Sequence, residues 1–167
     1  MRKLIISNSV LYLALGLLSI ALANKTQELT GSLNLYGVTM GMVILSQALG
    51  AYIFGRLSRK DKRVYQIKVL LYLMILSGIC VWILPTYLLM IISLIVFGTL
   101  NGGVEVNLKS YMADLTDKGG RGKMIGNYEA ITTLSAGLAM VSTGIISTYL
   151  IFPIILLLIL ISMLIIK

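Results

Sequence analysis

The sequence GRLSRKDKR, Gly55–Arg63, places five cations and a single carboxylate between two long apolar stretches. Each of these stretches runs for about 20 residues almost without charge, which is the length that an α-helix needs to cross the hydrocarbon core of a bilayer. A short, strongly basic segment between two such stretches is typical of a loop at a membrane surface. We therefore expect a membrane protein whose fold is organised around this loop.

The composition of the whole chain also indicates a membrane protein. Hydrophobic residues make up 58% of the 167 residues and charged residues 12%, too few polar groups to cover a soluble globule. Apolar segments that cross lipid must pair their own backbone groups, so each is expected to be a helix. The sequence predicts an all-α membrane protein with six transmembrane helices in one domain, residues 1–167, the helices being about 4–23, 35–55, 67–84, 86–107, 124–148 and 151–166.

The Lys and Arg residues fall in alternate connections between these runs. Thirteen of the 14 lie at the chain ends or in and beside the second and fourth connections, and Lys25 alone lies in the first. Because Lys and Arg collect on the cytoplasmic side, we expect both termini in the cytoplasm and a multi-pass protein of the cell (plasma or inner) membrane. The net charge of +8 is then a topology signal and does not indicate nucleic acid as a partner.

The first apolar run also fits a signal peptide, with Met1-Arg2-Lys3 before it and Ala21-Leu22-Ala23 as a cleavage site. That run is long for a signal peptide, and polar residues such as Asn8 and Tyr12 interrupt it. A retained helix also gives the even helix number that the charge distribution requires. We favour a retained helix, with cleavage as the alternative.

Two carboxylates lie inside the apolar runs. Ionisable groups in a membrane are costly and are functional candidates by default, so Glu105 and Glu129 are candidates for proton coupling. Pairing is the alternative for both. Glu105 precedes Lys109 by four residues, which favours an ion pair on one helix face, and Glu129 is expected to meet a cation of the preceding loop, such as Arg121 or Lys123.

Small residues recur at four-residue spacing in several of the apolar runs. This spacing places them on one side of a helix and allows two helices to approach closely. The prediction is a compact bundle whose contacts use the pairs Gly37 and Gly41, Ser46 and Gly50, Ala51 and Gly55, Gly98 and Gly102, Gly126 and Ala130, and Thr133 and Gly137.

Two loops carry a resemblance to a known family. GRLSRKDKR resembles the loop signature G-x-L-(A/S)-D-R-x-G-R-(R/K) of the major facilitator superfamily, in the same place between the second and third helices. The segment ADLTDKGGRGK, 113–123, resembles that family's A-D-L…R-G entry into the fifth helix. The order and the expected cytoplasmic side of both motifs agree with the family, and the likeness spans all six helices.

The resemblance implies a secondary active transporter that moves a small-molecule substrate by alternating access. The sequence corresponds to its N-terminal six-helix half of 3+3 repeats, present either as a half-size chain or as a fragment. A second six-helix half, in another chain or a second copy, would complete it within the lipid bilayer. The first and fourth helices would line the cavity, with Asn8, Tyr12, Asn101 and Glu105 as candidates, and Asn24 at the outer end. The cytoplasmic gate loops would use Gly55, Arg59, Arg63, Asp114, Arg121 and Gly122, with Arg63 paired to Asp114 as a latch.

The motif also departs from the family pattern. The signature Asp is replaced by Arg59, and the following Gly by Lys62. This departure supports an alternative function, a non-transporting membrane subunit or assembly factor that keeps the fold. The sequence predicts no enzyme, no cofactor and no metal site, since it contains no His and no nucleotide-binding motif. An apolar or amphipathic solute is slightly favoured over a sugar phosphate or dicarboxylate, which would require Arg or Lys within the helices.

Overall fold

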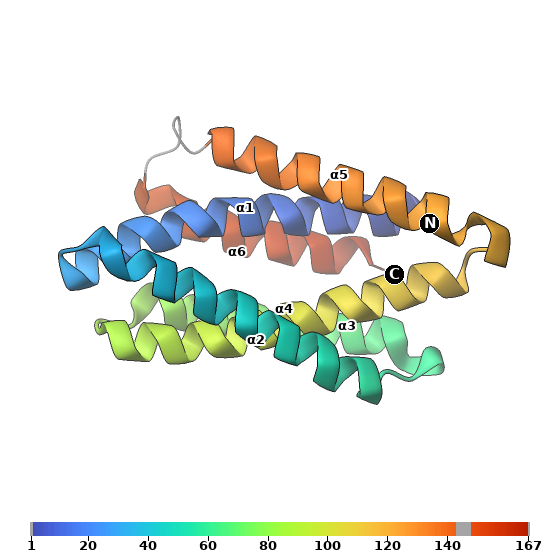
Figure 1. Ribbon diagram of the computed structural model, residues 1–167, viewed down its shortest axis with the longest axis horizontal. Helices are drawn as coiled ribbons and strands as arrows, with labels where there is room; N and C mark the ends of the chain where they lie inside the picture. The colour runs from blue at the N-terminus through green and yellow to red at the C-terminus, as the bar shows by residue number, and fades with distance from the viewer. Residues whose placement is uncertain (1, 143–147, 167) are drawn as a thin grey trace.

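Figure 1 shows the computed structural model, which describes residues 2–142 and 148–166. Over these residues the chain is helical, with short connections. The long helices are α1 (Arg2–Thr30), α2 (Tyr36–Leu57), α3 (Arg63–Ile83), α4 (Tyr87–Asp114), α5 (Arg121–Ser142) and α6 (Thr148–Ile165), and the short 3-10 helices are η1 (Leu33–Leu35), η2 (Lys60–Lys62) and η3 (Lys118–Gly120).

The helices form two groups of three that lie against each other (Figure 1). In one group α4 packs closely against both α2 and α3, and in the other α1 packs against both α5 and α6. Contacts of α1 with α2 and of α3 with α6 join the groups. The first turn of α1, the last turn of α6 and the α2–α3 and α4–α5 connections lie toward the same end of the bundle, as the alternating charge pattern predicted.

Four of the described helices, α1 to α4, are long and apolar enough to cross a membrane. Helix α6 is apolar over Leu150–Ile165 but shorter. Helix α5 does not reach the same apolar content, because it carries Arg121, Lys123 and Glu129 in its first half. The expected fifth helix extended to residue 148, and its residues 143–147 lie outside the described part of the chain.

Two helices run further than the sequence predicted. Helix α1 was expected to end at Ala23 before a loop, but it continues to Thr30 and ends at Gly31, whose φ of 69° is a left-handed conformation that favours glycine. Helix α4 was expected to end at Asn107 and continues to Asp114. Polar residues mark where a helix leaves the apolar region, but they do not stop its backbone hydrogen bonding.

Glycines on α2 and α4 allow the closest helix contact in the bundle. A Cβ atom added at Gly50 would overlap the backbone of Thr99, and one added at Gly98 or Gly102 would overlap atoms of α2. Gly16 also brings α1 close to α5, where an added Cβ would lie 2.6 Å from the carbonyl oxygen of Ala136. The predicted role of small residues is therefore confirmed at these α2–α4 positions.

Other small residues do not pack as the sequence predicted. A Cβ atom added at Gly37, Gly41, Gly126 or Gly137 would meet nothing within 4 Å among the described residues. Four-residue spacing identifies one side of a helix, but it does not say whether a neighbour covers that side. On α2 and α5 these positions face open space.

Candidate functional site

Polar side chains gather on the face that α1, α2, α4 and α5 share. A cavity of about 220 Å³ there is lined by apolar residues together with Tyr12, Ser19, Gln47 and Asn101. An adjoining hollow of about 420 Å³ between α2 and α4 is also lined by Gln47, and by Glu105 and Lys109. Gln47 therefore lies on the wall of both cavities.

A charged cluster forms one edge of this face. The Lys109 ammonium lies 2.6 Å from Oε1 of Glu105, one helical turn away, and 2.7 Å from Oε1 of Glu129 on α5. Gln47 donates a hydrogen bond from Nε2 to Oε2 of Glu105 at 2.8 Å, and the ring of Tyr128 lies 5.8 Å from the ammonium. We call Gln47, Glu105, Lys109 and Glu129 the charged cluster; it carries two carboxylates and one ammonium.

The position of Glu129 corrects one expectation. The sequence predicted a loop cation, Arg121 or Lys123, as its partner, but the carboxylate meets Lys109 of α4 instead. Arg121 and Lys123 lie about two turns before Glu129 on the same helix and are exposed. The predicted pair of Glu105 and Lys109 is present, and it is extended by a third member from another helix.

The charged cluster is only partly shielded from its surroundings. The side chains of Glu105, Lys109 and Glu129 are 22%, 34% and 47% exposed. All three side chains therefore keep part of their surface outside the packed helices. The ammonium touches one carboxylate from each group of three helices, so it ties α4 to α5, which otherwise contact each other little.

Asn8 does not line either cavity. Its side chain is fully buried on α1, and within the described structure neither of its amide atoms has a hydrogen-bond partner. The hydroxyl of Tyr128 is likewise buried without a partner there. Unpaired polar groups in an apolar interior are costly, so Asn8 and Tyr128 form a second polar spot beside the charged cluster.

The predicted contact between Arg63 and Asp114 is present at the end of the bundle that holds both chain ends. The Arg63 guanidinium donates from Nη1 to the carboxylate of Asp114 and, at 3.0 Å, to the carbonyl oxygen of Ser110. Its Nε donates to Oγ of Ser58 at 3.2 Å, and Ser58 donates to Oδ1 of Asn107 at 2.7 Å. One side chain thus fastens the start of α3 to the end of α4.

The other residues predicted for the gate do not join this network. The Arg59 side chain is exposed, and the residue is engaged through its backbone: its N–H donates to Gln66 at 3.4 Å and its carbonyl oxygen accepts from the N–H of Lys62 at 3.0 Å. Arg121 donates from Nε to the carbonyl oxygen of Thr116 at 3.4 Å, within its own connection. Gly122 has no neighbour within 4 Å of an added Cβ, and Gly55 has only an ordinary contact with Val106.

Several residues of this face were not among the predicted site residues. Gln47 sits in an apolar run on a helix that was not expected to line the cavity. Lys109 was read as a helix-end partner of Glu105, because the helix was expected to stop near it. Gln47 and Lys109 share one feature that the sequence could have revealed: each is a polar side chain within a helix long enough to cross a membrane. Asn24 lies elsewhere, at the far end of α1. No group of three or more His, Cys, Asp or Glu suited to a metal occurs within the described residues.

Comparisons with known proteins agree on one family. The family model described as Major Facilitator Superfamily matches residues 4–166. The Major myo-inositol transporter IolT of Bacillus subtilis (strain 168) is 32% identical over 120 residues, which is 70% of this chain and 25% of that protein. The match thus spans about a quarter of that relative's length. No solved structure matches the chain significantly.

Proposed function

The chain belongs to the major facilitator superfamily and is a membrane protein, and on that premise we propose that its helices form one six-helix half of a secondary active transporter. The transporter carries a small solute by alternating access, rocking two halves around a central site. The charged cluster, together with Tyr12 and Asn101, is the observation that carries this proposal, because these polar groups lie on one face shared by four helices.

The solute that fits this face best is a small, uncharged, hydroxyl-rich molecule. Tyr12, Gln47 and Asn101 offer amide and phenol groups, which both donate and accept hydrogen bonds and so suit hydroxyls. The name of the matched relative, a myo-inositol transporter, supports the same class. Among the described residues that line these two cavities, Lys109 is the one cation. It is already held by two carboxylates, which disfavours a phosphorylated or dicarboxylic solute.

We assign proton coupling to the charged cluster. Glu105 lies on the same helix as Lys109, so the contact between α4 and α5 depends on Glu129. A proton on Glu129 removes the negative charge that holds the Lys109 ammonium across this contact. The tie between α4 and α5 then weakens, and the two groups of three helices gain freedom to move against each other. The partial exposure of all three side chains supports proton exchange from water.

The Arg63–Asp114 pair acts in this scheme as a latch at the cytoplasmic end. Its orientation toward the cytoplasm follows from the concentration of Lys and Arg in the connections at that end. Arg63 holds α3 and α4 together through several acceptors, so α2, α3 and α4 move as one body. The chain then sits in the cell membrane with both ends toward the cytoplasm.

A second six-helix half covers the open faces of α2 and α5. Only 17% of the apolar window of α2 is buried, against 56% for α1 and α4. Gly41 on α2 and Gly137 on α5 have free space above them, and large apolar side chains beside them, including Leu45, Leu134 and Leu138, are exposed. Another chain, a second copy of this one or a further part of the same protein serves as that half.

The alternative is a non-transporting membrane subunit or assembly factor with the same fold. The observation in its favour is Arg59, which replaces an acidic signature residue and has an exposed side chain. A transporter moves solute across a membrane, and a non-transporting subunit does not, so a transport measurement discriminates between the two functions. The intact latch and the charged cluster favour the transporter.

Two measurements test the proposal. Native mass spectrometry of the purified chain in nanodiscs shows whether a second half is bound. Uptake of radiolabelled polyols into proteoliposomes that contain this assembly then measures transport, with Glu105→Gln as the variant and Arg59→Ala as the control. Uptake that depends on Glu105 supports a transporter, and an assembled complex with no uptake of any tested solute supports the non-transporting alternative.

A further inference from the structure

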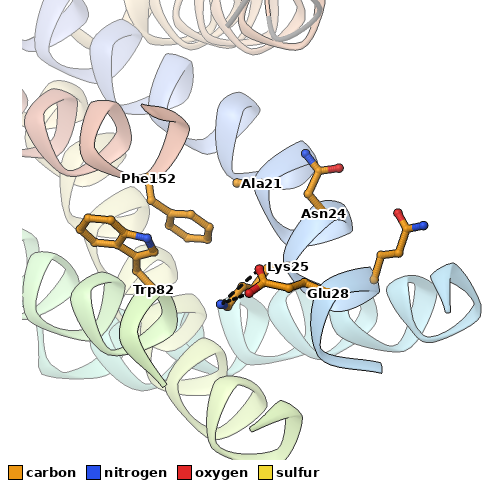
Figure 2. Close-up of a pocket in the computed structure, with 7 residues that line it drawn as sticks. Ala21, Asn24, Lys25, Glu28, Trp82 and Phe152 are labelled. Atoms are coloured by element: carbon orange, nitrogen blue, oxygen red, sulfur yellow. Dashed lines mark hydrogen bonds and ion pairs between the residues drawn. The ribbon is translucent and has the colours of Figure 1, made fainter. Parts of the chain in front are cut away.

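A second pocket lies at the end of the bundle remote from the Arg63–Asp114 latch. It has a volume of about 610 Å³ and is bounded by the end of α1, the end of α3 and the beginning of α6. Figure 2 shows its lining side chains, with the rings of Trp82 and Phe152 close together on one side and Lys25 beside Glu28 below them. Asn24 and Gln27 complete its polar rim. None of these residues belongs to the charged cluster.

Lys25 is the residue that indicates a ligand-binding site in this pocket. It is the one Lys or Arg in the first connection predicted from the sequence, whereas the other 13 gather toward the opposite side. Its side chain is only 15% exposed, and among the described residues its ammonium is held by Glu28, at 3.3 and 3.4 Å from the two carboxylate oxygens. These distances exceed the about 2.7–2.9 Å of a strong charge-assisted hydrogen bond. An ammonium has three donors, so Lys25 can bind a further anionic group.

Glu28 offers the opposite charge at the mouth of the same pocket. Its side chain is 67% exposed, so its carboxylate can meet a cation without moving far from Lys25. The pocket therefore presents an ammonium and a carboxylate side by side. A ligand that carries an anion and a cation a few bonds apart matches this arrangement.

The aromatic side of the pocket fits the boundary of a membrane. Trp82 is the penultimate residue of α3 and its side chain is partly exposed. Trp residues are enriched where lipid head groups meet acyl chains. Leu76 on α3 and Leu157 and Leu160 on α6 are exposed along the two helices that supply the rings, so acyl chains can lie against them.

We propose that this pocket binds the head group of a zwitterionic phospholipid with a primary amine, the phosphatidylethanolamine class. The phosphate accepts hydrogen bonds from Lys25, and the lipid ammonium donates to Glu28. Trp82 and Phe152 contact the glycerol and the first methylenes of the acyl chains. A choline head group lacks the N–H donors for Glu28, and a glycerol head group lacks the positive charge.

Trp82 provides a direct readout because it is the only Trp in the chain. The purified protein in detergent micelles is titrated with phosphatidylethanolamine, phosphatidylcholine and phosphatidylglycerol of identical acyl chains, and the Trp82 emission is followed. We expect phosphatidylethanolamine to act at about fivefold lower concentration than the other two, as a partly shielded ion pair would give. Lys25→Gln should weaken the response to all three lipids, because each of them carries the phosphate that Lys25 binds, and Glu28→Gln should make the ethanolamine and choline lipids equal.

Lys68→Gln is the matched control, since Lys68 lies near the opposite end of α3 from Trp82; it should retain the preference. Equal response to the ethanolamine and choline lipids in the unmodified protein would overturn the proposal, as would an unchanged response to all three lipids in a folded Lys25→Gln variant. If soluble phosphoethanolamine competes as well as the lipid, the pocket binds a free phosphate ester and the lipid assignment is wrong. Should Lys25→Gln not fold, the head-group series and Glu28→Gln decide the question alone.

Discussion

The Lys109 ammonium on α4 lies 2.7 Å from a carboxylate oxygen of Glu129 on α5, although the two residues are 20 positions apart and belong to different groups of three helices. The contact joins two helices that otherwise meet little. Its strength depends on charge rather than on packing, so protonation or a neutral substitution changes it directly.

Replacing Lys109 tests the coupling assigned to the charged cluster. Lys109→Met leaves two carboxylates without their shared cation, so we expect proton-driven uptake to fall at least about tenfold, the change that 1.4 kcal/mol gives. Solute exchange without a proton gradient should fall less. Uptake in proteoliposomes with and without an imposed pH gradient separates the two. Equal losses under both conditions would contradict a coupling role.

The contribution of the Glu129–Lys109 contact to the free energy of unfolding can be measured separately. Glu129→Gln, Lys109→Met and the double variant form a cycle, from which we expect an interaction free energy of up to about 1 kcal/mol, as for partly exposed ion pairs. Thermal unfolding in detergent supplies the values. Strictly additive single effects would show that the contact contributes nothing measurable.

Arg63→Ala should destabilise the protein clearly. The side chain is 15% exposed and donates to Asp114, to the backbone of Ser110 and to Ser58. Removing hydrogen bonds of a charged group costs about 1.5–3 kcal/mol, so the melting temperature should fall. Arg59→Ala is the matched control, because the Arg59 side chain is exposed and only its backbone is engaged. Similar melting temperatures for the two variants would rule out the latch.

Gly50→Ala tests the close contact between α2 and α4. The added methyl group would overlap the backbone of Thr99, which cannot move aside as a side chain can. We expect a loss of about 1–3 kcal/mol, typical of overpacking. Gly41→Ala on the same helix has free space and should be close to neutral. A detergent melting assay compares the two, and equal stabilities would show that the helices separate easily at Gly50.

Gln47→Leu tests the solute site. Gln47 borders both cavities and holds Glu105 by a hydrogen bond. Loss of a hydrogen bond to the solute should raise the KM for uptake by about tenfold, corresponding to 1.4 kcal/mol, with a smaller change in the maximal rate. Leu73→Ala, at an exposed position of α3 that lines neither cavity, serves as the control. A KM that is unchanged in Gln47→Leu would remove this residue from the solute site.

The sequence predicted much of the fold because its signals are local. Apolar length and the alternation of Lys and Arg depend on composition within a window, and α1 to α4 cover the expected runs. The four-residue spacing of Gly98 and Gly102 and of Ser46 and Gly50 identified a real contact. The same spacing at Gly37 and Gly41 led to an expected contact that the structure lacks, because the pattern contains no information about a neighbour.

The candidate site was predicted only in part. Tyr12, Asn101 and Glu105 border the two cavities, while Asn8 is buried and lines neither of them. Gln47 and the Lys109–Glu129 contact were missed, because each depends on how far α4 extends and on which helix faces it. Arg63 and Asp114 were paired through the resemblance of two loops rather than through any local rule.

The sequence by itself determined that this is a helical membrane protein of the major facilitator superfamily, because hydrophobic length, charge asymmetry and two loop motifs act within short windows of the chain. Only the tertiary structure decided that Lys109 is shared by carboxylates of α4 and α5, that Gln47 borders the cavities, and that Lys25 lies shielded in a pocket beside Trp82. Electrostatic and packing interactions act over a few ångströms in space, and residues far apart in the chain come within that range only when the helices have packed.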